Sequence, residues 1–460
     1  MSVPYLIPVL IYASLALAFA MFSKRARTLK CVLVASYCGV IVTSFTGGAS
    51  GGVWLAPLFL YLLSPWILFG AKLPAFGSMK VGRLTFALFV VFFVGILVGL
   101  VRYDPLLDIE KAGSFQRFMG VPTRVLMAGY RVVSLCSIVL AFMLPLRHRI
   151  DRPLLVQCLK LCWLFSLVLA CLGIIDYLGL ADMAFSYRRE AGYGHVAILG
   201  FHRASLGMIT VVGIFASFTL TQIAPRSWLT TLVYLSAPVL LLALLFSWSR
   251  AAMLAIGVGA VSLTFTMTGT RAIKATAITF CCLLIVGIMI SLSPELKDRF
   301  ALPTSGGLEE SSAGRLRGWM QLVTWLVQSP GVLITGVGFQ NFNYFVHLSS
   351  GAVELEAAHN NYLHILTEHG IFGFLIFIAW ILAMLGWLLG WRRTVGDGPA
   401  RVIPSIFLSL VLAIVVSCLT QESLAPSSAM MPFLLHFYLI LGIWMSHYRA
   451  EMAQRSGLVG

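Results

Sequence analysis

The chain has 460 residues, of which 59% are hydrophobic and 11% are charged, and its mean hydropathy is +0.93. These values exclude a water-soluble domain of this length, because soluble domains carry about 25% charged residues. The net charge of +15 is spread over the links between apolar runs, so we interpret it as a signal of membrane orientation and expect no nucleic-acid partner.

Apolar runs long enough to cross a hydrocarbon core recur along the whole chain, since about 20 helical residues span about 30 Å. The expected spans are approximately 3–22, 31–45, 53–71, 84–101, 125–145, 155–175, 204–222, 229–248, 251–268, 275–293, 371–391, 403–420 and 428–446. The predicted fold is an all-α polytopic membrane helix bundle of about 12–13 transmembrane helices. The link between the second and third spans is so short that a re-entrant hairpin is an alternative there.

The N-terminal apolar run lacks the features of a cleaved signal peptide. No basic segment precedes residues 3–20, and Lys24, Arg25 and Arg27 follow them. We therefore expect a retained first helix with its N-terminus outside. An even number of helices would require one span fewer.

A long polar stretch interrupts the apolar pattern and divides the chain into four expected regions. They are the first part of the membrane bundle at 1–293, a polar loop at 294–358, the C-terminal helices of the bundle at 359–448 and a tail at 449–460. The loop is expected to contain short interfacial helices.

The distribution of charge predicts which side of the membrane each loop faces. When the loops are assigned to two sides alternately, 19 of the 32 basic residues fall on one side, giving about +16 there and about −1 on the other. The positive side is the cytoplasm. The loop at 294–358 is then periplasmic, and the tail at 449–460 is cytoplasmic.

Arginine dominates the basic residues predicted to face the periplasm. Because the guanidinium group binds phosphate through two parallel hydrogen bonds, we expect a phosphorylated ligand on this side. Contacts with lipid headgroups and with acidic neighbours are the alternative. Arg203 and Arg250 lie at the edges of apolar spans, where a charge is costly and is usually paired or functional. For Arg203, snorkelling to the interface is a further alternative.

Part of the periplasmic loop has a helical pattern. Residues 311–327 have apolar residues at helical spacing and two tryptophans, which predicts a short helix in the plane of the interface. Arg315 and Arg317 lie in its first turn, where unpaired backbone amides also favour an anion. The glycine-rich segment at 336–342 predicts a tight turn.

The loop ends at a histidine that immediately precedes the next predicted span. A neutral imidazole accepts a proton near pH 7, so His359 is the candidate base. One alternative is a purely structural His359 that caps the backbone. Another is a metal site formed by His364, Glu368 and His369, but their spacing is not that of a zinc protease. We expect no metal and no cofactor.

The order of these motifs resembles the O-antigen ligase and polymerase superfamily of bacterial envelopes. The resemblance covers about residues 200–400. It is carried by Ser-Trp-Ser-Arg at 247–250, Gly-Arg-Leu-Arg-Gly-Trp at 314–319, Gly-Val-Gly-Phe-Gln-Asn-Phe at 336–342, Ala-His-Asn-Asn-Tyr-Leu at 358–363 and Glu-His-Gly-Ile-Phe-Gly at 368–373.

The resemblance implies a metal-independent glycosyltransferase in the bacterial inner membrane. Such enzymes transfer a glycan from undecaprenyl pyrophosphate to an acceptor hydroxyl at the periplasmic face. The acceptor is a lipid A core sugar for a ligase. For a polymerase it is another lipid-linked glycan, and a chain-length regulator is then a possible partner.

The family's essential residues match particular positions of this chain. His359 matches the essential loop histidine, and Arg250 and Arg315 match the two essential arginines, although Arg317 competes with Arg315. The further candidates for substrate binding are Arg203, Arg317, Asn360 and Tyr362. Membrane lipids are expected to surround the bundle.

The predicted chemistry is a single displacement that inverts the anomeric configuration. The base takes the proton of the acceptor hydroxyl, and fixed arginines stabilise the charge that develops on the leaving pyrophosphate. The alternative function is a transporter or flippase for a lipid-linked or anionic solute. The polar residues gather on one side of the membrane, which favours an enzyme.

Overall fold

The structure, a computed structural model, describes residues 79–102, 123–178, 197–198, 201–223, 228–247, 249–267, 312–339, 341–342, 346, 357–396, 399–424 and 430–456. Within these ranges the chain is helical apart from one antiparallel pair of two-residue strands, β1 (Ala197–Ile198) and β2 (Phe201–His202). Ala197 pairs with His202 and Ile198 with Phe201. This small hairpin leads directly into the next helix.

The helices in chain order are α4 (Lys80–Val101), α6 (Thr123–Leu146), α7 (Arg152–Tyr177), α8 (Arg203–Ile223), α9 (Trp228–Phe246), α10 (Arg250–Thr266), α13 (Ser312–Gln328), α14 (Pro330–Thr335), α15 (Asn361–Thr394), the 3-10 turn η6 (Pro399–Arg401), α16 (Val402–Ser417) and α17 (Met431–Arg455). Among the residues that the structure describes, four segments are long and apolar enough to cross a membrane: Lys80–Val101, Arg152–Ile175, Ala204–Ile223 and Asn361–Thr394. The predicted class, an all-α multi-pass membrane bundle, is confirmed.

Most of the expected spans that fall within the described ranges differ from the observed helices by a few residues. The spans at 3–22, 31–45, 53–71 and 275–293 lie outside the described residues, so the total of 12–13 helices stays a prediction. Helix α17 continues to Arg455, so the first residues of the predicted tail at 449–460 are helical.

Helix α15 departs furthest from its prediction. The expected span begins at residue 371, whereas the helix begins at Asn361 and has a kink at Gly370, with φ 66° and ψ −174°. The first turns of α15 contain two histidines and a glutamate, so residues 361–370 are less apolar than a typical membrane span. Neighbouring segments supply partners for two of these groups, since Glu368 accepts from the Phe342 amide and His364 lies beside Glu422.

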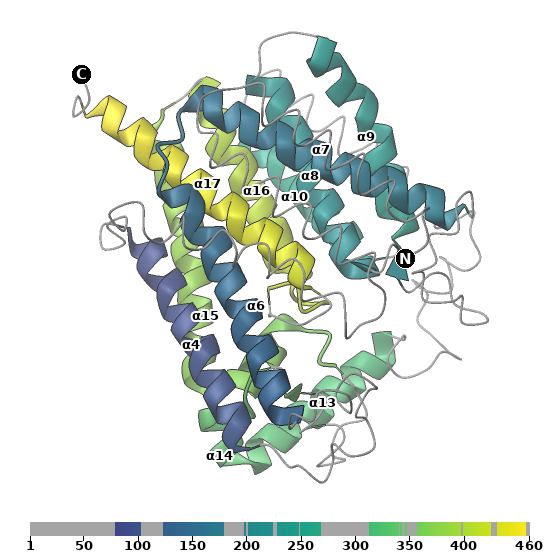
Figure 1. The fold of residues 1–460 in the computed structure, drawn as a ribbon, viewed down its shortest axis with the longest axis vertical. Helices are drawn as coiled ribbons and strands as arrows, with labels where there is room; N and C mark the ends of the chain where they lie inside the picture. The colour runs from purple at the N-terminus through teal and green to yellow at the C-terminus, as the bar shows by residue number, and fades with distance from the viewer. Residues whose placement is uncertain are drawn as a thin grey trace.

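The ends of the helices gather at two opposite ends of the bundle. At one end Arg392 Nη2 donates to the Thr266 carbonyl (2.9 Å) and Arg455 Nη1 donates to the Thr394 carbonyl (3.2 Å). We call this the basic end, because it holds arginines of α15 and α17. Helices α13 and α14 lie at the other end, next to the far ends of α4 and α6 (Figure 1). We call this the α13 end.

Large aromatic side chains fill the space between the helices. Trp380, Trp391, Trp444 and Tyr438 are almost completely buried. The Trp380 indole N–H donates to Thr85 Oγ1 (2.9 Å), which joins α15 to α4 and satisfies a polar atom in an apolar interior. This packing fixes α15 against α4 over much of its length.

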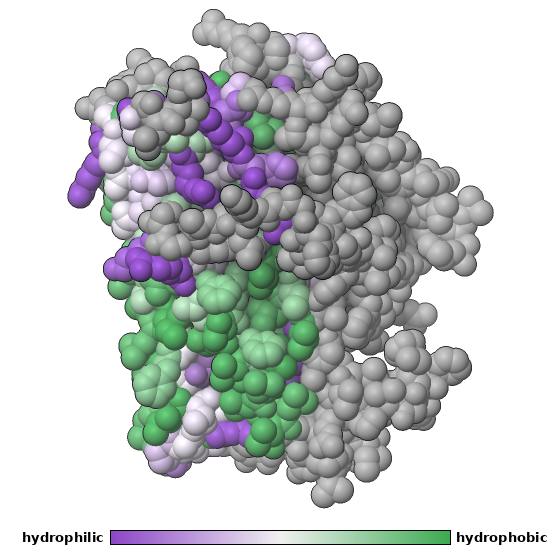
Figure 2. Space-filling model, turned by 60° about the vertical axis from the view of Figure 1, so that its left-hand side comes forward, coloured by the Kyte–Doolittle hydropathy of each residue, from purple (hydrophilic) through white to green (hydrophobic). Residues whose placement is uncertain are grey.

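One outer face of the bundle is a broad apolar area. Figure 2 shows this area with hydrophilic side chains gathered beyond its upper edge. Exposed apolar side chains on α4 and α15 include Phe86, Val94, Phe372, Leu375 and Leu382. An apolar surface of this kind is expected where helices contact lipid tails, because lipid imposes no cost on exposed apolar groups.

Helix α13 is apolar on two faces. Its buried positions are Gly314, Gly318, Leu322 and Leu326, which recur every four residues and pack onto the protein. A second row, formed by Leu316, Met320, Val323 and Val327, is exposed, with 45–68% of each side chain accessible. The helix predicted from residues 311–327 is confirmed. Its exposed apolar row suits a position in the membrane interface.

Candidate active site

The first turn of α15 starts at a residue with an unusual backbone conformation. His359 has φ 47°, the left-handed region, which His, Asn and Asp enter more readily than most residues. Asn360 follows as the N-cap, and its Oδ1 accepts from the amides of Tyr362 (3.0 Å) and Leu363 (3.1 Å). The local sequence therefore turns the loop sharply into the helix at His359.

The segment after α16, residues 418–424, wraps around this helix start. The Asn361 amide donates to the Cys418 carbonyl (2.8 Å), and the Leu424 amide donates to Asn361 Oδ1 (2.9 Å). The Tyr362 hydroxyl donates to the Val415 carbonyl (2.9 Å). These three hydrogen bonds join the start of α15 to residues 415–424, which are far away in the sequence, and fix the two segments relative to each other.

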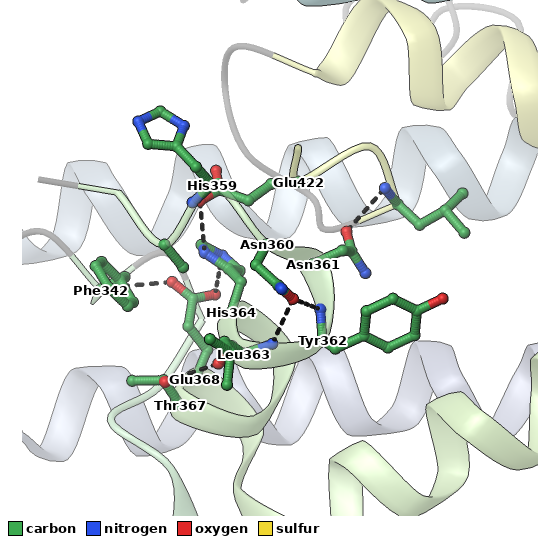
Figure 3. A network of polar contacts seen from close by, with 12 residues as sticks. Phe342, His359, Asn360, Asn361, Tyr362, Leu363, His364, Thr367, Glu368 and Glu422 are labelled. Atoms are coloured by element: carbon green, nitrogen blue, oxygen red, sulfur yellow. Dashed lines mark hydrogen bonds and ion pairs between the residues drawn. The ribbon is translucent and has the colours of Figure 1, made fainter. Parts of the chain in front are cut away.

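A row of buried ionisable groups begins at this junction (Figure 3). Oε1 of Glu422 accepts from the backbone amide of His359 (2.9 Å) and lies 3.4 Å from Nδ1 of His364. On the other side of the same ring, Nε2 of His364 lies 3.2 Å from Oε2 of Glu368. Glu422 and Glu368 are 6% and 1% exposed, so His364 is held between two carboxylates away from water.

Burial by itself raises the pKa of Glu422. The charge and hydrogen bonding of His364, together with the charge and backbone amide of His359, outweigh burial and lower the pKa of Glu422 to about 2. Glu422 is therefore a carboxylate at any physiological pH. A permanent negative charge lies next to the backbone of the candidate base.

The row continues from Glu368 toward α6 and α4. The other carboxylate oxygen of Glu368 accepts from the Phe342 amide (3.2 Å), and Glu368 also interacts electrostatically with the buried Arg131. Arg131 Nη2 donates to Asn341 Oδ1 (2.8 Å). Asn341 in turn donates to the Gly99 carbonyl (3.3 Å). The two carboxylates, His364 and Arg131 thus form one buried cluster that links four segments.

A glycine-rich turn holds the Glu368 end of this cluster. The kink at Gly370 leaves the carbonyls of Thr367 and Glu368 available, and they accept from the amides of Val337 and Gly338 (2.9 Å each). Gly338 has φ 101° and lies so close to α4 that a Cβ atom would meet the Gly99 Cα at 2.3 Å. The tight turn predicted at 336–342 is confirmed for its described residues, and only glycine fits this approach.

Two of the three predicted catalytic residues meet the same segment. Arg315 Nη1 donates to the Thr420 carbonyl (3.1 Å), two residues before the glutamate that binds the His359 amide. The Trp319 indole N–H donates to the Ala358 carbonyl (2.6 Å), one residue before His359. The first half of α13 is therefore hydrogen-bonded both to the segment that follows α16 and to the residue that precedes His359.

Arg250, the third predicted residue, lies at the same end of the bundle. Helices α10 and α16 pack side by side and antiparallel: Ser405 bonds to Thr266, Ser262 to Ser409, and a Cβ on Gly259 would meet Ala413. Arg250 is the first residue of α10, so this register places it level with the segment that follows α16. Arg315 and the His359 amide thus bind residues 418–424, and Arg250 lies level with this segment.

The other candidates have more varied positions. Arg203 is the first residue of α8, and its side chain lies outside the described residues. Arg317 is exposed on α13, whereas Arg315 is half-buried and bonded, which favours Arg315 at the position where the two compete. The side chains of Asn360 and Tyr362 are engaged in the cap and the Val415 contact described above.

Sequence reasoning missed most of the buried cluster. His364 and Glu368 were considered only as metal ligands, and Glu422 and Asn341 were not singled out. One signal was available for Glu422 and Glu368: each is an acidic residue next to or within an apolar segment, where an ionisable group is costly unless it has a partner. The identity of the partner required the fold.

Comparison with known proteins agrees with these observations. Residues 235–378 match the family model described as O-antigen ligase, a range that includes Arg250, Arg315 and His359. A search of curated proteins gives no match. The resemblance drawn from the motifs is confirmed. Residues 235–378 are therefore an O-antigen ligase family domain within a multi-pass membrane protein.

Proposed function

We propose that this protein transfers a glycan from undecaprenyl pyrophosphate to an acceptor hydroxyl at the periplasmic face of the bacterial inner membrane. The observation that carries the proposal is that residues 418–424 bind both Arg315 and the His359 amide, with Arg250, the first residue of α10, level with that segment. A proton acceptor and two phosphate-binding groups are the minimum that this reaction requires.

The chemistry is a direct displacement. The imidazole of His359 takes the proton of the acceptor hydroxyl as its oxygen attacks the anomeric carbon. The bond between that carbon and the pyrophosphate oxygen breaks, and its electron pair stays on the pyrophosphate. Arg250 and Arg315 stabilise the added negative charge, so that no metal ion is required. A single displacement inverts the anomeric configuration.

The position of the site relative to the membrane follows from the two ends of the bundle. Arg392 and Arg455 lie at the basic end, which the positive-inside rule assigns to the cytoplasm. His359 lies at the α13 end, and the proposed active site is therefore periplasmic. An undecaprenyl tail then remains in the membrane while its pyrophosphate reaches the arginines. In this proposal residues 294–358 form the catalytic loop between the two parts of the membrane bundle, 1–293 and 359–448.

The test uses the full-length protein, purified in detergent and returned to lipid. Undecaprenyl-pyrophosphate-linked oligosaccharide is supplied alone in one arm and with lipid A core in the other, and new glycosidic bonds are measured. Longer lipid-linked glycans in the first arm indicate a polymerase, and glycosylated lipid A core in the second indicates a ligase. Movement of the donor across the bilayer without a new bond would support a flippase and refute the proposal.

Substitution of the base gives the sharpest test. We expect His359→Ala to lower the transfer rate by about 10²–10⁴-fold, the usual contribution of a general base. His359→Asn should lose as much, although asparagine tolerates the left-handed backbone at this position. The matched control is His148→Ala at the basic end, which should retain activity. Full activity in either His359 variant would show that another group takes the proton.

A further inference from the structure

The buried cluster contains two ionised groups of each sign. Both ring nitrogens of His364 face carboxylate oxygens, at 3.4 Å and 3.2 Å, and a carboxylate on each edge favours the protonated, cationic ring. Arg131 is the second cation and interacts with Glu368. Two carboxylates and two cations balance one another, which is the condition under which buried charges are tolerated.

We propose that Glu422 and His364 are positioning residues of the transferase site, with Glu422 holding His359 in its reactive place and His364 holding Glu422. This inference rests on the proposed function of His359. It assigns a positioning role to Glu422 and His364, neither of which is among the predicted catalytic residues.

Glu422 acts on His359 through the backbone. The His359 amide donates to Glu422 Oε1 at 2.9 Å, and His359 is a non-glycine residue in the left-handed region. A left-handed backbone conformation is unfavourable for a non-glycine residue unless its surroundings stabilise it, and this charge-assisted hydrogen bond does so. In Figure 3 the backbone of His359 faces Glu422 while its ring points away from His364 and Glu368. Glu422 thus fixes the direction of the His359 ring through its hydrogen bond to the His359 backbone amide.

Glu422 also stabilises the product of the proton transfer. When His359 accepts a proton it becomes a cation, and the nearby carboxylate favours that form. Among the described residues, the charged and titratable groups on the segments that meet at His359 are Glu422 after α16, His364 on α15 and Arg315 on α13. Glu422 is the negative group of these three, and the electrostatic effect is therefore assigned to it.

His364 keeps the carboxylate of Glu422 in place. Its ring stacks on Phe342, with centroids 5.7 Å apart and an interplanar angle of 18°, and is ion-paired on both edges. A ring held on its face and at both edges cannot rotate without breaking an ion pair. Glu422 therefore has one defined orientation toward the His359 amide.

The experiment compares Glu422→Gln with the wild-type protein in the transfer assay, and measures kcat, KM for the lipid-linked donor and the pH dependence of kcat/KM. Misplacement of a catalytic group by about 1 Å costs about 10²-fold in rate. We expect kcat to fall by about that factor, with KM changed less than about threefold. The acid limb of kcat/KM should move to lower pH by about one unit, because the carboxylate that favoured the protonated base is gone.

The matched control is Glu451→Gln at the basic end. Glu451 is also hydrogen-bonded, to the indole N–H of Trp391 (2.9 Å), but it lies in the last turns of α17. We expect Glu451→Gln to leave kcat and the pH profile unchanged. Wild-type kcat in Glu422→Gln overturns the inference, and so does a loss of kcat with an unmoved acid limb, because a purely structural residue would give the second result.

A second variant keeps the test open if Glu422→Gln does not fold. Glu422→Asp keeps the charge but shortens the side chain by one methylene, so kcat should fall while the acid limb stays in place. Wild-type kcat in Glu422→Asp would overturn the positioning role. The failure of the proposed function is distinguishable, because it appears in the wild-type protein as the absence of new glycosidic bonds in the same assay.

Discussion

Replacement of Gly370 by alanine tests how the kink of α15 supports the active site. Gly370 has φ 66° and ψ −174°, a region that is essentially restricted to glycine. A Cβ atom here would lie 2.1 Å from the Ile334 carbonyl oxygen and 2.9 Å from the Gly336 nitrogen, both of them backbone atoms. The side chain cannot rotate away from this clash, so the backbone has to move.

The cost of Gly370→Ala has two parts. The backbone strain amounts to about 1–3 kcal/mol, and insertion of a methyl group into a closely packed site adds about 1–3 kcal/mol. The total of about 2–6 kcal/mol would lower the unfolding temperature in detergent by roughly 5 °C. Transfer activity should fall as well, because the displaced turn carries the Val337 and Gly338 amides that bind the carbonyls of Thr367 and Glu368.

Gly386 in the same helix is the matched control. A Cβ atom there meets nothing within 4 Å. Gly386→Ala should therefore keep the unfolding temperature or raise it, since alanine favours a helix by about 1 kcal/mol over glycine. Equal unfolding temperatures for Gly370→Ala and the wild type would refute the reasoning, as would an equal loss in Gly386→Ala.

Three further predictions concern the proposed chemistry. Arg250→Lys should lower kcat/KM by about 10–100-fold although the charge is kept, because lysine lacks the planar two-point contact, while Arg317→Lys on the exposed face should stay near wild type in the same kinetics. Trp319→Phe removes the donor to the Ala358 carbonyl, a net loss of about 1 kcal/mol, and should lower both the unfolding temperature and the transfer rate without abolishing either. EDTA treatment of washed protein should leave the rate unchanged, and loss of activity with recovery on adding Mg²⁺ would contradict the metal-free mechanism.

The amino-acid sequence by itself determined the class of the protein and the choice of His359 as the candidate base. Hydrophobic runs at the length of a membrane crossing give helices because lipid leaves backbone groups no other partners. Helix α13 followed from its apolar spacing, and His359 from its place at the end of the polar loop. These features depend on local sequence, which is why the motifs alone carry the family resemblance.

The tertiary structure decided which groups surround His359. Glu422 reaches its amide across 63 residues of sequence, and the position of Arg250 depends on the register of α10 against α16. Sequence spacing on one helix suggested a metal site at His364 and Glu368, whereas the second carboxylate beside His364 comes from another segment. Long-range pairing of helices has no local signature, because many apolar faces can pack equally well in lipid. Only the folded bundle placed a buried carboxylate at the backbone of the candidate base.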